Sequence, residues 1–293
     1  MGIKHLVISG CGPEMLRYLG CIKYLMQNNY FSINDIENIY CTSAGSIIAL
    51  CIILEYDFET LEEYFINRPW NNLYNITAKH ILLFYKSKGL FGKKEIEESL
   101  NPLLKGKGLK SDITLKELYE FKKIRLIVNS VGINVQQNMN NEYFDYLSHP
   151  NLKLFDIIQM TSTIPLFIEP LVYQEKFYVD GGALVNYNSK ICLDNHKDNE
   201  CFGLNYSVEI EKQEKEFANF NLLDFFAIYN SANLSYTLKF NKTPKLSNEI
   251  CNKLSFSPFN INNIKKFIND KEFRKTLFNN GIEDGVKYLE SRI

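Results

Sequence analysis

The 293-residue chain lacks the features that mark several classes of protein. Its seven cysteines are odd in number and contain no C-x-x-C pair, which argues against both a disulfide framework and a thiolate zinc site. We interpret them as reduced, mostly buried thiols of a protein inside the cell. No apolar run reaches the length of a membrane span, and the one that follows His5 is too short for a secretory signal.

An excess of charge of either sign is also missing. The formal net charge is -1 and the lysines are scattered, so the sequence carries no electrostatic footprint for nucleic acid. Hydrophobic residues make up 45% and charged residues 23% of the chain, as in an ordinary globular protein. We expect a cytoplasmic or membrane-peripheral protein with a sizeable core and no nucleic-acid partner.

Ser43 is the lead candidate for a catalytic nucleophile. It lies between a strand-like segment, 36–41, and an apolar helical segment, 44–54. A sharp strand-to-helix turn lifts a serine hydroxyl clear of both elements, as in a nucleophile elbow. The match to the pattern G-x-S-x-G is partial, because Gly45 takes the final position but Cys41 replaces the first glycine.

A similar strand-turn-helix unit comes earlier in the chain. Its strand spans 3–9, its turn is Gly10-Cys11-Gly12 and its helix spans 15–28. Such a turn aims backbone N–H groups into a concavity that binds negative charge, although the glycines could simply make a tight turn. Two such units place both turns at one edge of a parallel sheet, where open α/β sheets bind ligands.

A serine nucleophile needs a proton acceptor, and the chain has only four histidines. His196 alone follows Ser43 and Asp180 in the order Ser, Asp, His of α/β-hydrolases. It lies in a polar loop that we expect to be solvated, which leaves a serine paired directly with a carboxylate. Asp180 suits this role because it precedes Gly181 and Gly182, so that a tight turn presents its side chain.

Several other segments give a structural signal. Residues 55–90 are rich in large apolar side chains, for which we favour core packing over a cover on an apolar site. Residues 124–133 predict a buried parallel strand and 134–142 an asparagine-rich turn. A hairpin is predicted from 171–173 and 176–179, directly before Asp180.

Jointly, these segments resemble the patatin-like phospholipases. The resemblance is carried by Gly10-Cys11-Gly12, Ser43-Ala44-Gly45-Ser46, Lys88-Gly89-Leu90-Phe91, Thr161-Ser162-Thr163-Ile164-Pro165-Leu166-Phe167 and the block from Tyr178 to Asn186, in that family's order and approximate spacing. It covers about residues 3–206, and the Asp-Gly-Gly block is its most specific part. It implies an α/β fold, a three-layer α/β/α sandwich with a mainly parallel central sheet.

The resemblance also implies a chemistry. Ser43 would be the nucleophile and Asp180 its base in a Ser-Asp dyad, with the backbone N–H groups of Gly10, Cys11 and Gly12 as the oxyanion hole. The family hydrolyses ester-linked acyl chains of lipids, here a phospholipase A type activity through an acyl-serine, without a metal or other cofactor. Expected partners are a phospholipid or another acyl ester and, transiently, a membrane surface.

The turn departs from the family's Gly-Gly-Gly-x-Arg/Lys-Gly, because Glu14 replaces the basic residue and Met15 the final glycine. A carboxylate there opposes an oxyanion unless it points away. Arg17 could pair with Glu14 or supply the missing charge. A catalytically silent domain that binds an acyl chain or a protein is therefore the alternative, and an acyl hydrolase for thioesters or soluble esters is a third.

The C-terminal part differs in texture from the part that carries the resemblance. Amphipathic stretches at 217–238 and 265–289 predict helices that pack on the sheet. We therefore divide the chain into a catalytic domain, 1–206, and a helical extension, 207–293, packed on the same domain.

Overall fold

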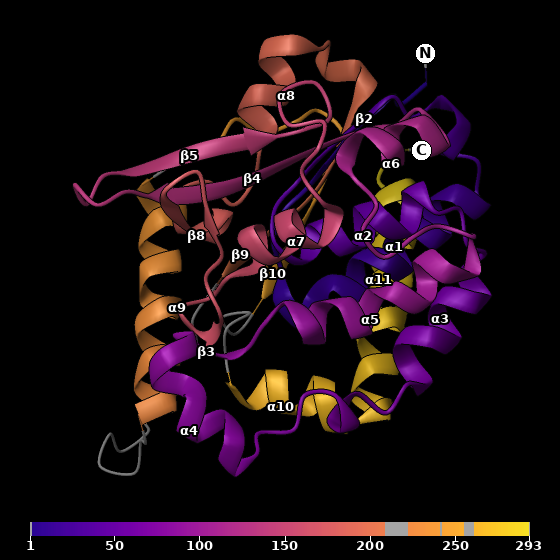
Figure 1. Ribbon diagram of the computed structural model, residues 1–293. Helices are drawn as coiled ribbons and strands as arrows, with labels where there is room; N and C mark the ends of the chain where they lie inside the picture. Colours follow the sequence, from indigo (N-terminus) through magenta and orange to yellow (C-terminus); the bar gives the residue numbers. More distant parts are fainter. Residues whose placement is uncertain (1, 209–221, 241, 255–260, 293) are drawn as a thin grey trace.

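A central β-sheet flanked by helices organises the chain. The computed structural model describes residues 2–208, 222–240, 242–254 and 261–292 (Figure 1). The strands of the main sheet are β1 (His5–Ile8), β2 (Asn38–Cys41), β4 (Arg125–Ile133), β5 (Met139–Phe144), β7 (Val172–Tyr173), β8 (Lys176–Asp180), β9 (Cys201–Val208) and β10 (Glu249–Leu254). A separate pair of strands consists of β3 (Gly89–Phe91) and β6 (Leu166–Ile168).

The described strands of the main sheet lie in the order β10-β9-β1-β2-β4-β8-β7, with β5 paired to β4 outside this path. From β10 to β4 every neighbouring pair is parallel. Strands β5, β7 and β8 add to this parallel part with antiparallel pairing. The predicted α/β/α arrangement with a mainly parallel sheet is confirmed.

The helices connect and cover these strands (Figure 1). They are α1 (Met15–Gln27), α2 (Ala44–Ile53), α3 (Phe58–Asn67), α4 (Ala78–Ser87), α5 (Lys93–Gly106), α6 (Leu115–Lys122), α7 (Leu154–Ser162), α8 (Ser189–Asn195), α9 (Leu222–Phe240), α10 (Ile261–Asn269) and α11 (Lys271–Glu290). Short 3₁₀ helices are η1 (Gly12–Glu14), η2 (Ile33–Asp35), η3 (Trp70–Asn72), η4 (Gly181–Ala183) and η5 (Asp198–Glu200). The helices predicted after the two turns, at 15–28 and 44–54, are confirmed to within one residue.

The sheet contains strands that the sequence pattern does not predict. β5 begins at Met139, inside the segment 134–142 that predicts only a turn. Its first two residues, Met139 and Asn140, are exposed, and three polar residues follow Met139, so the segment lacks the apolar alternation that marks a strand. β3 and β6 span three residues each, which is too short for any periodic signal.

The C-terminal segment contributes more than helices. Strand β10 pairs in parallel with β9, so the sheet continues across residue 206. The predicted helix 265–289 is in fact two helices, α10 and α11, and Asp270 caps the second by accepting hydrogen bonds from the backbone N–H groups of Glu272 and Phe273. Residues 217–221 of the other predicted helix lie outside the described residues, and α9 covers the whole of the remainder, 222–238.

The predicted hairpin delivers Asp180 to the edge of the sheet where the parallel strands end. Gln174 and Glu175 have φ of 46° and 59°, so both central residues of the two-residue turn are left-handed, as hairpin turns of this length favour. β8 then pairs antiparallel with β4, and Asp180 lies opposite Ser130.

The apolar segment 55–90 divides into two parts. Phe65 and Trp70 are buried, as the preference for core packing predicts. The apolar side chains of α4 are exposed instead, so that preference is wrong for this helix. Within the described residues, no helix combines the length and apolar character needed to span a membrane.

Candidate active site

Ser43 lies in a strained turn between β2 and α2. Its φ of 50° and ψ of -129° fall in a region that residues with a side chain rarely adopt. The turn is held by backbone hydrogen bonds from Gly45 N to Thr42 O and from Ser46 N to Ser43 O, each 2.8 Å long. Strand, sharp turn and helix are arranged as the sequence predicts for a nucleophile elbow.

The start of α2 passes close to the end of β1 at Gly45. A Cβ atom on Gly45 would lie 2.7 Å from the carbonyl oxygens of Ile8 and Ser9, so no larger residue fits without a shift. Cys41, at the first position of the elbow, is fully buried and its Sγ lies 3.7 Å from the Ile127 carbonyl oxygen. Burial raises the pKa of Cys41, so this thiol is not an activated nucleophile.

Asp180 ends β8 and is held at two points. Its backbone N–H donates to the Thr163 carbonyl oxygen at 2.8 Å, and its Oδ1 accepts a hydrogen bond from Gly182 N at 2.8 Å. A Cβ atom on Gly181 would lie 2.5 Å from Asn129 Nδ2, which explains the glycine at that position. The predicted tight turn therefore fixes the carboxyl group of Asp180. Its Oδ1 accepts the hydrogen bond from Gly182 N, whereas Oδ2 is not bound by the turn.

The carboxyl group of Asp180 is buried, and the Ser43 side chain is among the groups that shift its pKa. Burial raises the pKa of Asp180 to about 6, and a hydrogen bond from the Ser43 side chain and one from Gly182 N lower it. Oδ2 is buried and makes no regular hydrogen bond within the described part of the chain.

The turn Gly10-Cys11-Gly12 lies against Ser43. A Cβ atom on Gly10 would lie 2.8 Å from Ser43 Cβ and 3.3 Å from the Thr42 carbonyl oxygen, so only glycine permits this approach. Gly12 has a φ of 51°, which also favours glycine. The turn thus lies beside the candidate nucleophile. Gly10 N donates to the Asn186 carbonyl oxygen at 3.4 Å, and Cys11 and Gly12 lie at the start of η1.

Glu14 is buried at the end of η1, with 4% of its surface exposed. Burial raises the pKa of Glu14 to about 7, the charge of Arg17 lowers it and that of Asp284 raises it. The Arg17 guanidinium donates to both carboxylate oxygens of Asp284, at 2.5 and 3.0 Å, rather than to Glu14. The prediction that Arg17 could pair with Glu14 is therefore wrong, because Arg17 pairs with Asp284.

A buried network of hydrogen bonds holds the elbow in place. The backbone N–H of Ser43 donates to Thr161 Oγ1 at 2.8 Å, and that hydroxyl donates to the Asn129 carbonyl oxygen at 2.6 Å. Thr42 Oγ1 and Asn188 Nδ2 both donate to Asn129 Oδ1, at 2.5 and 2.9 Å. Sequence reasoning missed these residues, although Thr161 belongs to a motif that it singled out.

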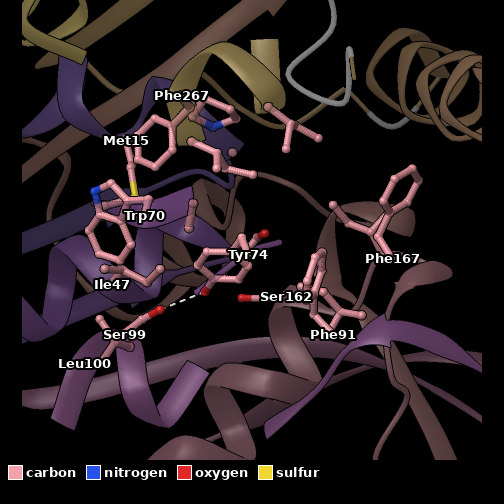
Figure 2. A pocket seen from close by; sticks show the side chains of 18 of the residues that line it. Met15, Ile47, Trp70, Tyr74, Phe91, Ser99, Leu100, Ser162, Phe167 and Phe267 are labelled. Atoms are coloured by element: carbon pink, nitrogen blue, oxygen red, sulfur yellow. Dashed lines mark hydrogen bonds between the residues drawn. The ribbon is translucent and has the colours of Figure 1, made fainter. Parts of the chain in front are cut away.

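Ser43 lines an apolar pocket of about 240 Å³. Figure 2 shows the side chains around it. Its apolar wall includes Met15, Ile47, Phe65, Trp70, Tyr74, Phe91, Leu100, Ile164, Phe167, Ile168, Ile264 and Phe267. The few polar groups are the side chains of Ser43, Ser99 and Ser162, and Ser99 is hydrogen-bonded to Tyr74 Oη at 2.7 Å. The pocket can hold an apolar chain with one end at Ser43.

His196 is not part of this site. Its Nε2 lies 2.9 Å from Tyr40 Oη, and its ring stacks on His5 with centroids 3.6 Å apart. His5 begins β1 and pairs with the first residue of β2, whereas Ser43 follows the last, so the two sites lie at opposite ends of these strands. The Ser, Asp, His order is therefore not a catalytic triad.

The remaining candidates for the chemistry are few. Within the described residues, no group of three or more His, Cys, Asp or Glu side chains could hold a metal ion. His80 accepts a hydrogen bond from Thr77 N as part of the cap of α4, and His149 lies 2.9 Å from Ser148 Oγ in a loop. The groups that remain as candidates at the elbow are thus the side chains of Ser43 and Asp180 and the backbone of the turn Gly10-Cys11-Gly12.

Comparison with known proteins gives a family. Residues 6–193 match the family described as patatin-like phospholipase, which is more than half of the chain. Among curated proteins, "Probable lipid hydrolase 463L" of Invertebrate iridescent virus 6 is 27% identical over 195 residues, which cover 66% of this chain and 64% of that protein. The chain thus spans less than two thirds of the length of this relative.

Two solved structures have a similar fold. VipD from Legionella pneumophila has a TM-score of 0.55 at 15% identity, over 99% of this chain and 67% of that one. The type III effector protein ExoU, from Pseudomonas aeruginosa, has a TM-score of 0.53 at 10% identity, over 100% of this chain and 53% of that one. At these identities the likeness concerns the fold.

Proposed function

The chain belongs to the patatin-like phospholipase family, and from this premise we propose that it is a lipid acyl hydrolase of the phospholipase A type. Its substrate is a phospholipid or another acyl ester, and it works through an acyl-serine formed on Ser43. The relative named as a lipid hydrolase supports the substrate class. The proposed setting is the cytoplasm, at or near a membrane surface.

The observation that carries the proposal is the position of Ser43, which lies on the strand-to-helix turn and lines an apolar pocket. The buried carboxyl group of Asp180 supports it, because the Ser43 side chain is among the groups that shift its pKa. With a pKa of about 6, Asp180 is mostly ionised at neutral pH and can accept the serine proton. A carboxylate that is fixed by Gly182 N needs no reorganisation to do so. Ser43 and Asp180 are therefore the proposed dyad.

The reaction has two halves. Ser43 Oγ attacks the ester carbonyl carbon while its proton moves to Asp180, and the negative charge that develops on the carbonyl oxygen is held by N–H groups of the Gly10 to Gly12 turn. Collapse expels the lysolipid alkoxide, which takes the proton from Asp180. Water then attacks the acyl-serine while Asp180 takes its proton, and Ser43 Oγ receives that proton as its bond to the acyl carbon breaks and the fatty acid is released. No step uses a metal or a cofactor.

The pocket defines which part of the substrate is held. Its wall is apolar along Ile47, Trp70 and Phe267 (Figure 2). Ser43 and Gly12 also line it. The fatty acyl chain of the ester would occupy this space, and its burial would fix the carbonyl carbon beside Ser43 Oγ.

Fatty-acid release from phospholipid vesicles tests the proposal. Ser43→Ala and Asp180→Ala should each lower the rate by at least about a thousandfold, because each removes a group that the reaction needs. His196→Ala is the matched control and should keep the wild-type rate, since that histidine lies at the other end of the strands. If Ser43→Ala releases fatty acid as fast as wild type, the dyad is wrong.

The buried Glu14 favours a second candidate function. Its carboxyl group lies beside the turn that should hold an oxyanion, so the domain could bind an acyl chain or a protein without catalysis. A fluorophosphonate probe separates the two, because labelling requires an activated hydroxyl. If the probe labels the wild type but not Ser43→Ala, the hypothesis of a silent domain is wrong. If the wild type is not labelled, the hypothesis of a hydrolase is wrong.

A further inference from the structure

Helix α4 exposes several large apolar side chains. Tyr85 is 93% exposed, Leu82 80%, Ile81 66% and Leu83 45%, and no residue of the helix is buried. A helix on the surface of a globular protein ordinarily turns such side chains toward the core. A contiguous apolar surface of this kind indicates an interaction site. We call the side chains of Ile81, Leu82, Leu83 and Tyr85 the α4 surface.

The helix itself is well formed without a partner. Thr77 and His80 make a reciprocal cap at its start, and Lys88 ends it in the left-handed conformation with a hydrogen bond from its N–H to the Phe84 carbonyl oxygen. Figure 1 shows α4 at the lower left margin of the molecule, away from the main sheet. The exposure is therefore a property of a capped helix and not of a frayed end.

The sequence segment that contains α4 carries charge of one sign. Between Glu63 and Glu95 the sequence contains no acidic residue but six basic ones, Arg68, Lys79, Lys86, Lys88, Lys93 and Lys94. Lys93 pairs with Asp156 and Lys94 with Glu98, whereas Lys79, Lys86 and Lys88 form no ion pair with any residue that the structure describes. Three lysines thus remain to attract an anionic partner.

The α4 surface is connected to the pocket at both ends of the helix. Tyr74 precedes α4 and Phe91 follows it, and both side chains line the pocket (Figure 2). Their rings are in edge-on contact, with centroids 5.3 Å apart, and His80 of α4 contacts Phe91 at 5.6 Å. A partner that covers α4 therefore lies beside the wall that would receive the acyl chain.

We propose that the α4 surface docks on an anionic lipid bilayer. Leu82 and Tyr85 enter the boundary between head groups and acyl chains, while Lys79 and Lys86 contact the anionic head groups. This inference rests on the proposed function, since docking through α4 places the lipid substrate beside the pocket. A second copy of the chain is a poorer occupant, because a two-fold contact through α4 would set lysines against lysines.

Vesicle co-sedimentation of the Ser43→Ala protein tests the docking without digesting the lipid. The vesicles are phosphatidylcholine alone or with a minority of phosphatidylserine. We expect binding that is stronger with phosphatidylserine and that falls roughly tenfold in Leu82→Glu, because a leucine leaves the bilayer and a charge opposes it. Leu147→Glu is the matched control and should bind as before, since Leu147 is also exposed, at 61%, but lies in the loop after β5.

The lysines give a separate test of the lipid charge. Lys79→Gln with Lys86→Gln should weaken binding to the phosphatidylserine vesicles by roughly tenfold or more and leave binding to pure phosphatidylcholine unchanged. Thermal denaturation of each variant shows that exposed substitutions leave the fold intact. Equal binding by Leu82→Glu and the parent protein, or a concentration-dependent dimer that Leu82→Glu abolishes, overturns the proposal.

The docking and the catalysis can fail independently. If the protein binds vesicles through α4 but the wild type releases no fatty acid, the docking stands and the hydrolase does not. If Leu82→Glu binds and hydrolyses vesicles as well as wild type, the hydrolase stands and the docking does not.

Discussion

The side chain of Asn186 joins the turn after β1 to the turn after β8. Its Nδ2 donates a hydrogen bond to the Gly10 carbonyl oxygen at 3.0 Å. Its Oδ1 lies 2.8 Å from the place where a Cβ atom on Gly10 would be and 2.9 Å from that of Gly182. The buried carboxamide of Asn186 therefore sets the distance between the candidate oxyanion turn and the loop that carries Asp180.

Replacing Asn186 should loosen this spacing. We expect Asn186→Ala to lower kcat for a short soluble ester by roughly a hundredfold with little change in KM, because the donors move relative to the reacting oxygen while the pocket is untouched. Asn195→Ala, at the exposed end of α8, is the control and should be silent. An unchanged kcat in Asn186→Ala would show that Asn186 only fills space.

The rate should depend on pH through two buried carboxyl groups. Asp180 must be ionised to accept a proton, so kcat/KM should rise tenfold per pH unit below about 6 and level off above it. Ionisation of Glu14, with its pKa of about 7, then opposes the oxyanion and lowers the rate. We expect a bell-shaped profile with its maximum between these values, measured with a soluble ester after subtraction of spontaneous hydrolysis.

Glu14→Gln should remove the alkaline side of that profile. Above pH 8 the variant should be faster than wild type by about tenfold, since a neutral amide replaces a carboxylate beside the turn. Below pH 6 the two proteins should have the same rate, because Glu14 is then protonated and carries no charge, like the glutamine that replaces it. A variant as slow as wild type at high pH would mean that the Glu14 carboxylate does not act on the oxyanion.

Asp180→Asn should stabilise the fold while it stops catalysis. The folded-state pKa of about 6 exceeds the ordinary value of 3.8, so the folded protein binds this proton more tightly and loses stability as the pH rises from about 4 to 6. The variant lacks this loss and should be more stable by up to ~3 kcal/mol at neutral pH. Denaturant unfolding at pH 7 and pH 4 measures it, and the gain should be absent at pH 4.

The sequence predicts the parts of the site whose signal is local. Ser43 stands out because a strand, a turn with Gly45 and an apolar helix follow one another within a few residues, and Asp180 because two glycines follow it. Asn186 and Thr161 are different, since their partners lie 176 and 118 residues away along the chain. In a chain rich in asparagine, composition cannot separate such a residue from a loop residue.

The fold shows the same division. The helices after both turns are predictable to within one residue because apolar spacing decides them. The apolar run in α4 is misleading, since composition predicts burial but the packing of the whole molecule decides it. β10 is missed because it completes the sheet only once β9 is in place. The helix α11 is predicted, but its contact with α1 is not, because that contact depends on glycines of both helices.

The contact between α1 and α11 should make the C-terminal segment inseparable from the rest. A Cβ atom on Gly20 would lie 2.0 Å from the Phe278 carbonyl oxygen, and one on Gly281 would lie 1.8 Å from that of Arg17. Gly20→Ala should therefore force the helices apart and destabilise the protein by about 3 kcal/mol, lowering Tm by roughly 5 °C or more. Gly2→Ala, with no atom within 4 Å, is the control. An unchanged Tm in Gly20→Ala would mean that residues 207–293 do not form one cooperative unit with the sheet.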